Sequence, residues 1–156
     1  MGNRSAALTR SGSSASIAWG LVALRVALGV FLIMKSTTKF GWLMDGAPLI
    51  ARLAAWAAEP DAFWLSGWYA QMLLPGAPVF ARLVLFGELA GGLALLAGFW
   101  TRPVALLATL MILNYHLASG GLVAMDFLSD ASGLVVVAAL LALALDGRNL
   151  PLSVAG

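Results

Sequence analysis

The stretch GELAGGLALLAGFW, residues 87–100, decides the fold, because it is a run of small and apolar side chains interrupted by one carboxylate, Glu88. Such a run predicts a helix that crosses a lipid bilayer, whose hydrocarbon core of about 30 Å takes roughly 20 apolar residues. A carboxylate within the bilayer is costly unless protein rather than lipid surrounds it. We therefore expect Glu88 to face other helices and to have a partner there.

The composition of the whole chain also indicates an integral membrane protein. Its 156 residues are 62% hydrophobic and only 10% charged, and the mean hydropathy of +0.95 lies outside the usual range of soluble domains. The predicted fold is an all-α integral membrane protein, a four-helix transmembrane bundle that forms a single domain over residues 17–150. The four apolar runs that predict its helices are residues 17–36, 79–100, 103–122 and 126–145.

Two segments lie outside these runs. Residues 1–16 are polar, Ser-rich and basic, which predicts a flexible tail. Residues 39–78, between the first two runs, contain four of the six tryptophans and several Pro and Gly residues. Apolar side chains recur there at helical spacing, which predicts an amphipathic helix lying in the membrane interface. These side chains are Leu49, Ile50, Leu53, Trp56 and Ala57.

Charge and residue usage exclude several classes of function. The nine Lys and Arg residues are scattered and balanced against seven Asp and Glu, so the chain lacks the basic stripe of a nucleic-acid-binding protein. There is no cysteine, which excludes disulfides, thiolate metal sites and iron–sulfur ligation. The single histidine excludes bis-histidine haem ligation within one chain. We expect no metal site, no covalently bound cofactor and no catalysis by this chain alone.

Lys and Arg are almost evenly divided between the two sides of the predicted bundle. Arg4 and Arg10 precede the first helix, and the first helix usually dominates orientation. We therefore expect a multi-pass protein of the cell inner (plasma) membrane with both termini in the cytoplasm.

Arg25, in the first run, is the natural partner for Glu88. In an antiparallel pair with a rise of 1.5 Å per residue, both lie about 14 to 17 Å from the outer edge of the bilayer. The pair either fixes the register of the helices or lines a polar pocket for a quinone or another ligand. The further candidates for such a pocket are Lys39, Tyr115 and His116.

Each of these residues also has a structural interpretation. His116 can make an ordinary hydrogen bond between helices, and Lys39 can extend to the outer interface. Asp126 and Asp130 can cap the start of the fourth helix. A stripe of small residues on the second helix allows another helix to approach closely. This stripe consists of Gly87, Gly91, Ala94 and Gly98.

Two blocks of residues resemble the DoxX family of small four-helix membrane proteins, which is related to the DoxD membrane subunit of thiosulfate:quinone oxidoreductase. The first block is Arg25, Gly29 and Lys39, with Ser36 where the family tends to have glycine. The second block follows the family signature E…GG.L…GF.TR and spans Glu88 to Arg102, with matches at Glu88, Gly91, Gly92, Leu93, Gly98, Phe99, Thr101 and Arg102. The resemblance covers all four helices and implies that the Arg25 and Glu88 arrangement is a family feature.

Three functions fit these observations. The first is an accessory or structural subunit that packs against other membrane subunits of a larger redox or electron-transfer complex. The second is a quinone-interacting oxidoreductase subunit, with quinone or lipid as its ligand and the bilayer as its surroundings. The third and weakest is a transporter of a small lipophilic solute, because the chain lacks an evident internal repeat.

Overall fold

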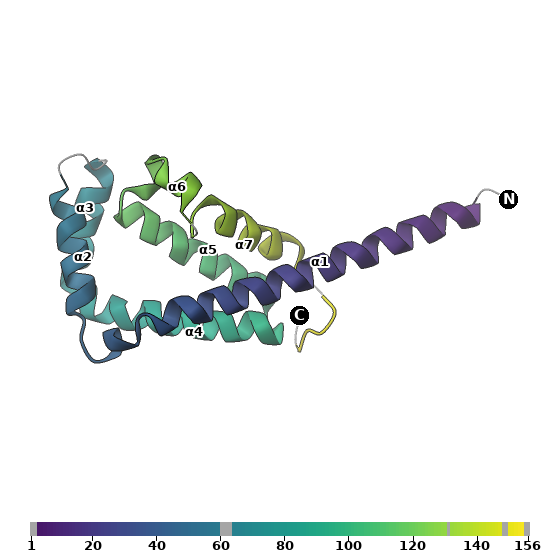
Figure 1. Ribbon diagram of the computed structural model, residues 1–156, viewed down its shortest axis with the longest axis horizontal. Coiled ribbons are helices and arrows are strands. Elements are labelled where there is room, and N and C mark those ends of the chain that lie inside the picture. The colour runs from purple at the N-terminus through teal and green to yellow at the C-terminus, as the bar shows by residue number, and fades with distance from the viewer. Residues whose placement is uncertain (1–2, 60–63, 131, 148–149, 155–156) are drawn as a thin grey trace.

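The computed structural model describes residues 3–59, 64–130, 132–147 and 150–154, and the regular elements within these ranges are all helices (Figure 1). This confirms the predicted all-α class. The α-helices are α1 (Asn3–Thr37), α2 (Ala47–Ala58), α3 (Trp64–Leu73), α4 (Ala77–Ala97), α5 (Thr101–Ala118), α6 (Asp126–Ser129) and α7 (Leu134–Asp146). Short 3₁₀ helices are η1 (Phe40–Leu43), η2 (Leu74–Gly76) and η3 (Gly121–Val123).

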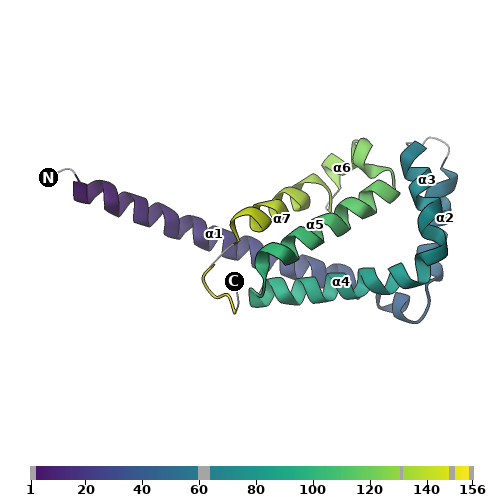
Figure 2. The same ribbon diagram turned by 180° about the vertical axis from the view of Figure 1, so that it is seen from behind.

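Two stretches of the described chain are long and apolar enough to cross a membrane. They are Ala15–Thr37, within α1, and Trp64–Ala97, which comprises α3, η2 and α4. The chain turns sharply at η2, which contains Pro75 and Gly76, so that only α4 runs alongside α1 (Figure 1). α5 and α7 pack against each other, α5 also contacts α4, and α7 also contacts α1 (Figure 2).

Helices α1 and α4 pack closely against each other, because a glycine from each helix lies at their contact. A Cβ atom at Gly29 would lie 2.9 Å from the Gly92 carbonyl oxygen, and one at Gly92 would lie 2.8 Å from the Gly29 oxygen. The two backbones therefore touch where neither residue has a side chain.

The predicted small-residue stripe lies beside this contact. Gly98 is buried, Gly91 and Ala94 are half-buried, and Gly87 is exposed. At Gly87 the neighbour is α5, because a Cβ there would lie 3.3 Å from Met111 Sδ. The helix faces α1 mainly through Gly92, one position away from Gly91, because the register of the pair brings Gly29 opposite that residue.

The tryptophan-rich segment forms two helices where the sequence predicts one. α2 is amphipathic as expected, with Leu49 and Leu53 buried, Trp56 and Ala57 half-buried, and Ile50 40% exposed. α3 packs beside α2, and Figure 1 shows this hairpin lying across one end of the bundle formed by α1, α4 and α5. Together with η1 and the start of α4 the hairpin encloses its own apolar core, so it is an integral part of the fold.

The fourth predicted helix, residues 126–145, is broken, which corrects the prediction of one continuous span. α6 ends at Ser129 and α7 begins at Leu134. Between them, Asp130 Oδ1 accepts hydrogen bonds from the Ser132 backbone N–H at 2.8 Å and from Ser132 Oγ at 3.0 Å. Aspartate commonly forms such a local turn in competition with the helix. Asp126 begins α6, but its side chain lies outside the described residues.

α4 and α5 form the tight hairpin that the sequence predicts. Gly98 ends α4 with φ of +66°, and the Phe99 N–H donates to the Ala94 carbonyl at 2.8 Å. Glycine adopts this left-handed conformation without steric cost. α5 then begins at Thr101, with Pro103 in its first turn as expected.

The N-terminal segment is part of α1 and extends this helix beyond the other helices. α1 begins at Asn3, so residues 3–16 are helical where the sequence predicts a tail without regular structure. Figure 1 shows this part of α1 projecting away from the other helices. The flexibility of the segment stays a prediction.

Candidate ligand-binding cavity

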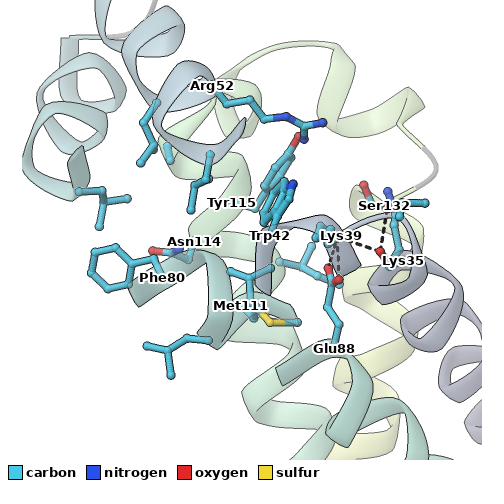
Figure 3. A pocket seen from close by; sticks show the side chains of 18 of the residues that line it. Lys35, Lys39, Trp42, Arg52, Phe80, Glu88, Met111, Asn114, Tyr115 and Ser132 are labelled. Carbon is cyan, nitrogen blue, oxygen red and sulfur yellow. Dashed lines mark hydrogen bonds and ion pairs between the residues drawn. The ribbon is translucent and has the colours of Figure 1, made fainter. Parts of the chain in front are cut away.

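A cavity of about 570 Å³ lies where the α2–α3 hairpin meets α1, α4 and α5 (Figure 3). A volume of this size is typical of sites for small organic ligands. Its wall is mainly apolar and aromatic, with a few polar groups. The aromatic and polar lining residues are Phe31, Lys35, Thr38, Lys39, Trp42, Arg52, Trp56, Tyr69, Phe80, Glu88, Asn114, Tyr115 and Ser132.

A buried ion pair forms the polar part of this wall. Lys39 Nζ donates to Glu88 Oε1 at 2.7 Å and to Glu88 Oε2 at 2.6 Å, and both side chains are 11% exposed. Lys39 Nζ also donates to the Lys35 carbonyl at 3.2 Å. An ammonium group has three donors, so these bonds use all of them, whereas the Glu88 carboxylate keeps lone pairs that can accept further bonds.

The predicted pair of Arg25 with Glu88 is wrong, because Lys39 takes the place of Arg25. The prediction assumed that the outer ends of the two helices lie at the same level. In the structure, Gly29 lies against Gly92, which gives a different register. Glu88 therefore sits level with about residue 33 of α1, and Arg25 is eight residues, or roughly 12 Å, farther along that helix. Lys39 follows the end of α1, and its long side chain reaches back to Glu88.

Arg25 instead binds the C-terminal segment. Its guanidinium donates from Nη1 to Ser153 Oγ at 2.7 Å and from Nη2 to the Leu152 carbonyl at 3.2 Å. The side chain is 1% exposed, and a Cβ at Gly98 would lie 2.2 Å from Nη1. Arg25 does not line the cavity, so it leaves the set of candidate pocket residues.

The remaining candidates divide into two groups. Tyr115 lines the cavity, with its ring centroid 5.3 Å from that of Trp56 in an edge-to-face arrangement. His116 is buried behind the wall, where Nε2 lies 3.1 Å from the Ser132 carbonyl oxygen and the ring packs edge-on against Phe127. This hydrogen bond from a helix to a loop corresponds to the structural interpretation of His116.

Several cavity residues were not among the predicted site residues. Asn114 precedes Tyr115 and accepts a hydrogen bond from the Tyr69 hydroxyl, which joins α5 to α3. Arg52 lies over the Trp42 ring, with Cζ 5.5 Å from the ring centroid. Hydrophobic periodicity assigns Arg52 to the polar side of its helix. Nothing in the local sequence shows that α2 folds over the bundle.

Ser132 joins the cavity to the turn before α7. The same turn that breaks the helix brings the Ser132 backbone N–H to Asp130 Oδ1, which accepts its hydrogen bond at 2.8 Å. Ser132 also lines the cavity and accepts the His116 contact through its carbonyl group. Among the described residues, no three His, Asp or Glu side chains gather into a metal-binding group.

In the described residues, a helical fold with two stretches long and apolar enough to cross a membrane, and with a cavity under an aromatic hairpin, is typical of a helical membrane protein. The DoxX family model matches residues 20–120, nearly two thirds of the chain. The protein belongs to the DoxX family. No curated protein and no solved structure matches the chain.

Proposed function

We propose that this protein is an accessory membrane subunit of a larger redox or electron-transfer complex and that its cavity binds a quinone. The observation that carries the proposal is the Lys39–Glu88 ion pair on the wall of an otherwise apolar and aromatic cavity. Membrane-embedded ionisable residues that line a cavity are typical of ligand and proton pathways.

The cavity wall offers the hydrogen-bonding groups that a quinone requires. The ring and its isoprenoid tail fit against apolar and aromatic side chains such as Trp42, Phe80 and Met111. The Asn114 amide and the Tyr115 hydroxyl can donate to a quinone carbonyl, and Glu88 can accept from a quinol hydroxyl. Electrons come from a partner subunit in this proposal, because a chain without cysteine has no thiol redox chemistry of its own.

The proposal includes a multi-pass arrangement in the inner (plasma) membrane. α1, α4, α5 and the α6–α7 segment cross the bilayer, and the α2–α3 hairpin lies in the outer interface, where tryptophan is favoured. α7 has 13 residues, or about 20 Å of helix, so α6 and the Asp130 turn complete the last crossing. Both termini are then cytoplasmic.

The test is purification of the tagged protein from its native membrane in a mild detergent. Mass spectrometry then identifies co-purified subunits, and organic extraction measures bound quinone. We expect a redox subunit and quinone in near-stoichiometric amounts. Glu88→Gln should lower the quinone content about tenfold, because it removes the carboxylate that faces the cavity.

Arg82→Gln is the matched control. Arg82 is a cation on the same helix, but it is exposed, binds the Leu43 and Pro78 carbonyls and does not line the cavity. It should retain the quinone. Recovery of wild-type protein with a redox partner but without quinone would disprove the cavity assignment and leave the subunit role intact.

A purely structural accessory role is the second candidate, and the exposed part of the small-residue stripe favours it. Gly87 is exposed, with Met111 Sδ 3.3 Å from the position of a Cβ, and a Cβ at the half-buried Gly91 would lie 3.7 Å from Leu32 and 3.9 Å from Val104. A partner helix can approach closely at such a surface. Gly91→Leu, whose Cβ would meet side chains of this chain only at ordinary contact distances, should then release the partner subunit without changing the quinone content.

A further inference from the structure

The cavity wall carries an excess of positive charge. Three cationic side chains, Lys35, Lys39 and Arg52, line it together with one carboxylate, that of Glu88. Lys39 and Glu88 neutralise each other. The cavity therefore keeps the charge of Lys35 and Arg52.

Each of these two cations lies beside an aromatic ring, and Lys35 is also near enough to Glu88 and Asp130 to interact with them electrostatically without forming an ion pair. Lys35 Nζ lies 5.7 Å from the Phe31 ring centroid, and Arg52 Cζ lies 5.5 Å from the Trp42 centroid. Within the described parts of the chain, the one salt bridge is Lys39–Glu88, so no described carboxylate pairs with Lys35 or Arg52. Figure 3 shows Arg52 beside Trp42, and Lys35 beside Lys39.

Lys35 and Arg52 also hold the unused charged donors of the site. The three Lys39 donors are taken by the Glu88 carboxylate and the Lys35 carbonyl. A negatively charged group that enters the cavity therefore meets Lys35 and Arg52 as its available cationic donors. Phosphate and carboxylate groups make their strongest hydrogen bonds with ionised donors of this kind.

The rest of the wall suits an acyl chain. Leu32, Leu49, Leu53, Leu73, Val84 and Ile112 face the same cavity. Basic side chains pair with phosphate and carboxylate head groups, and an adjoining apolar wall can receive an acyl chain. A neutral ligand leaves the two cations without a counter-charge.

We propose that the cavity binds an anionic amphiphile, whose phosphate or carboxylate head group pairs with Lys35 and Arg52 while its acyl chain lies against the apolar wall. The inference rests on the proposed role of the cavity as a ligand site, but not on the identity of the ligand as a quinone. An acidic lipid then either is the ligand or occupies the site when quinone is absent.

The experiment is native mass spectrometry of the delipidated full-length protein, titrated separately with oleate, phosphatidic acid, phosphatidylcholine and a short-chain quinone. We expect the acidic amphiphiles to bind more tightly than phosphatidylcholine. Lys35→Gln and Arg52→Gln should each weaken acidic binding about fivefold, and the double variant about thirtyfold, from the usual contribution of one basic residue to acidic-lipid binding.

Arg82→Gln again provides the control, because it removes a cation at the same end of α4 but outside the cavity. Equal weakening by Arg82→Gln, or equal binding of phosphatidylcholine, would overturn the proposal, since it would show general surface attraction. Tight binding of oleate alone assigns a carboxylate ligand, and tight binding of phosphatidic acid alone assigns a phosphate ligand.

The quinone titration separates this inference from the proposed function. If Lys35→Gln with Arg52→Gln abolishes acidic binding and leaves quinone binding unchanged, both proposals stand. Quinone binding without preference for acidic amphiphiles refutes only the anionic site. Acidic binding without quinone binding refutes only the quinone assignment.

Discussion

Lys39 and Glu88 form a buried ion pair that joins the end of α1 to the middle of α4, with Nζ 2.6 Å from Oε2. The pair answers why so apolar a helix contains a carboxylate. The Glu88 side chain is 11% exposed, and its charge is compensated by a cation from the turn that follows α1. The same contact fixes the polar wall of the cavity, so it links the stability of the fold to the site.

Removal of one partner of this pair should destabilise the protein. Glu88→Gln leaves the Lys39 ammonium buried without a counter-ion, and we expect a loss of about 3 kcal/mol in the free energy of unfolding. The measurement is thermal unfolding in detergent, followed by circular dichroism. Replacement of both residues, as Lys39→Met with Glu88→Leu, should recover most of the loss. Strictly additive effects of the two changes would contradict a direct interaction.

The contact between α1 and α4 should tolerate no side chain at its centre. Gly92→Ala places a Cβ 2.8 Å from the Gly29 carbonyl oxygen, and overpacking of this kind costs about 1–3 kcal/mol. The unfolding temperature should fall accordingly. Gly20→Ala is the matched control on α1, because nothing lies within 4 Å of its Cβ position. The control should be neutral or stabilising, since alanine favours a helix more than glycine.

The contact of Arg25 with the C-terminal segment should contribute to stability. Ser153→Ala removes a 2.7 Å hydrogen bond from the guanidinium, and bonds to charged groups contribute about 1.5–3 kcal/mol. Thermal unfolding should show a loss of this size. Ser119→Ala provides a comparison, because Ser119 Oγ makes only local hydrogen bonds, to the His116 carbonyl at 3.3 Å and from the Gly121 N–H at 3.4 Å. An equal effect of both changes would show that the Arg25 contact adds nothing specific.

The sequence predicted the features that follow from composition and local chemistry. Apolar runs gave the positions of α1, α4 and α5, and Pro103 marked the hairpin between α4 and α5, whereas the end of α4 at Gly98 comes before the predicted end at residue 100. The need of Glu88 for a cationic partner also followed from its place in an apolar run. The break at Asp130 was missed, because hydrophobicity continues across it and the Asp130–Ser132 bonds are visible only as a turn in the structure.

Register was decided by tertiary structure alone. Two apolar helices can slide past each other with little change in buried apolar area, so hydrophobicity does not specify which residues lie opposite. The Gly29–Gly92 contact sets the register, and it brings Lys39 rather than Arg25 to Glu88. The cavity also depends on tertiary structure. Arg52, Tyr69 and Asn114, from α2, α3 and α5, line one cavity only because the α2–α3 hairpin folds across the end of the bundle.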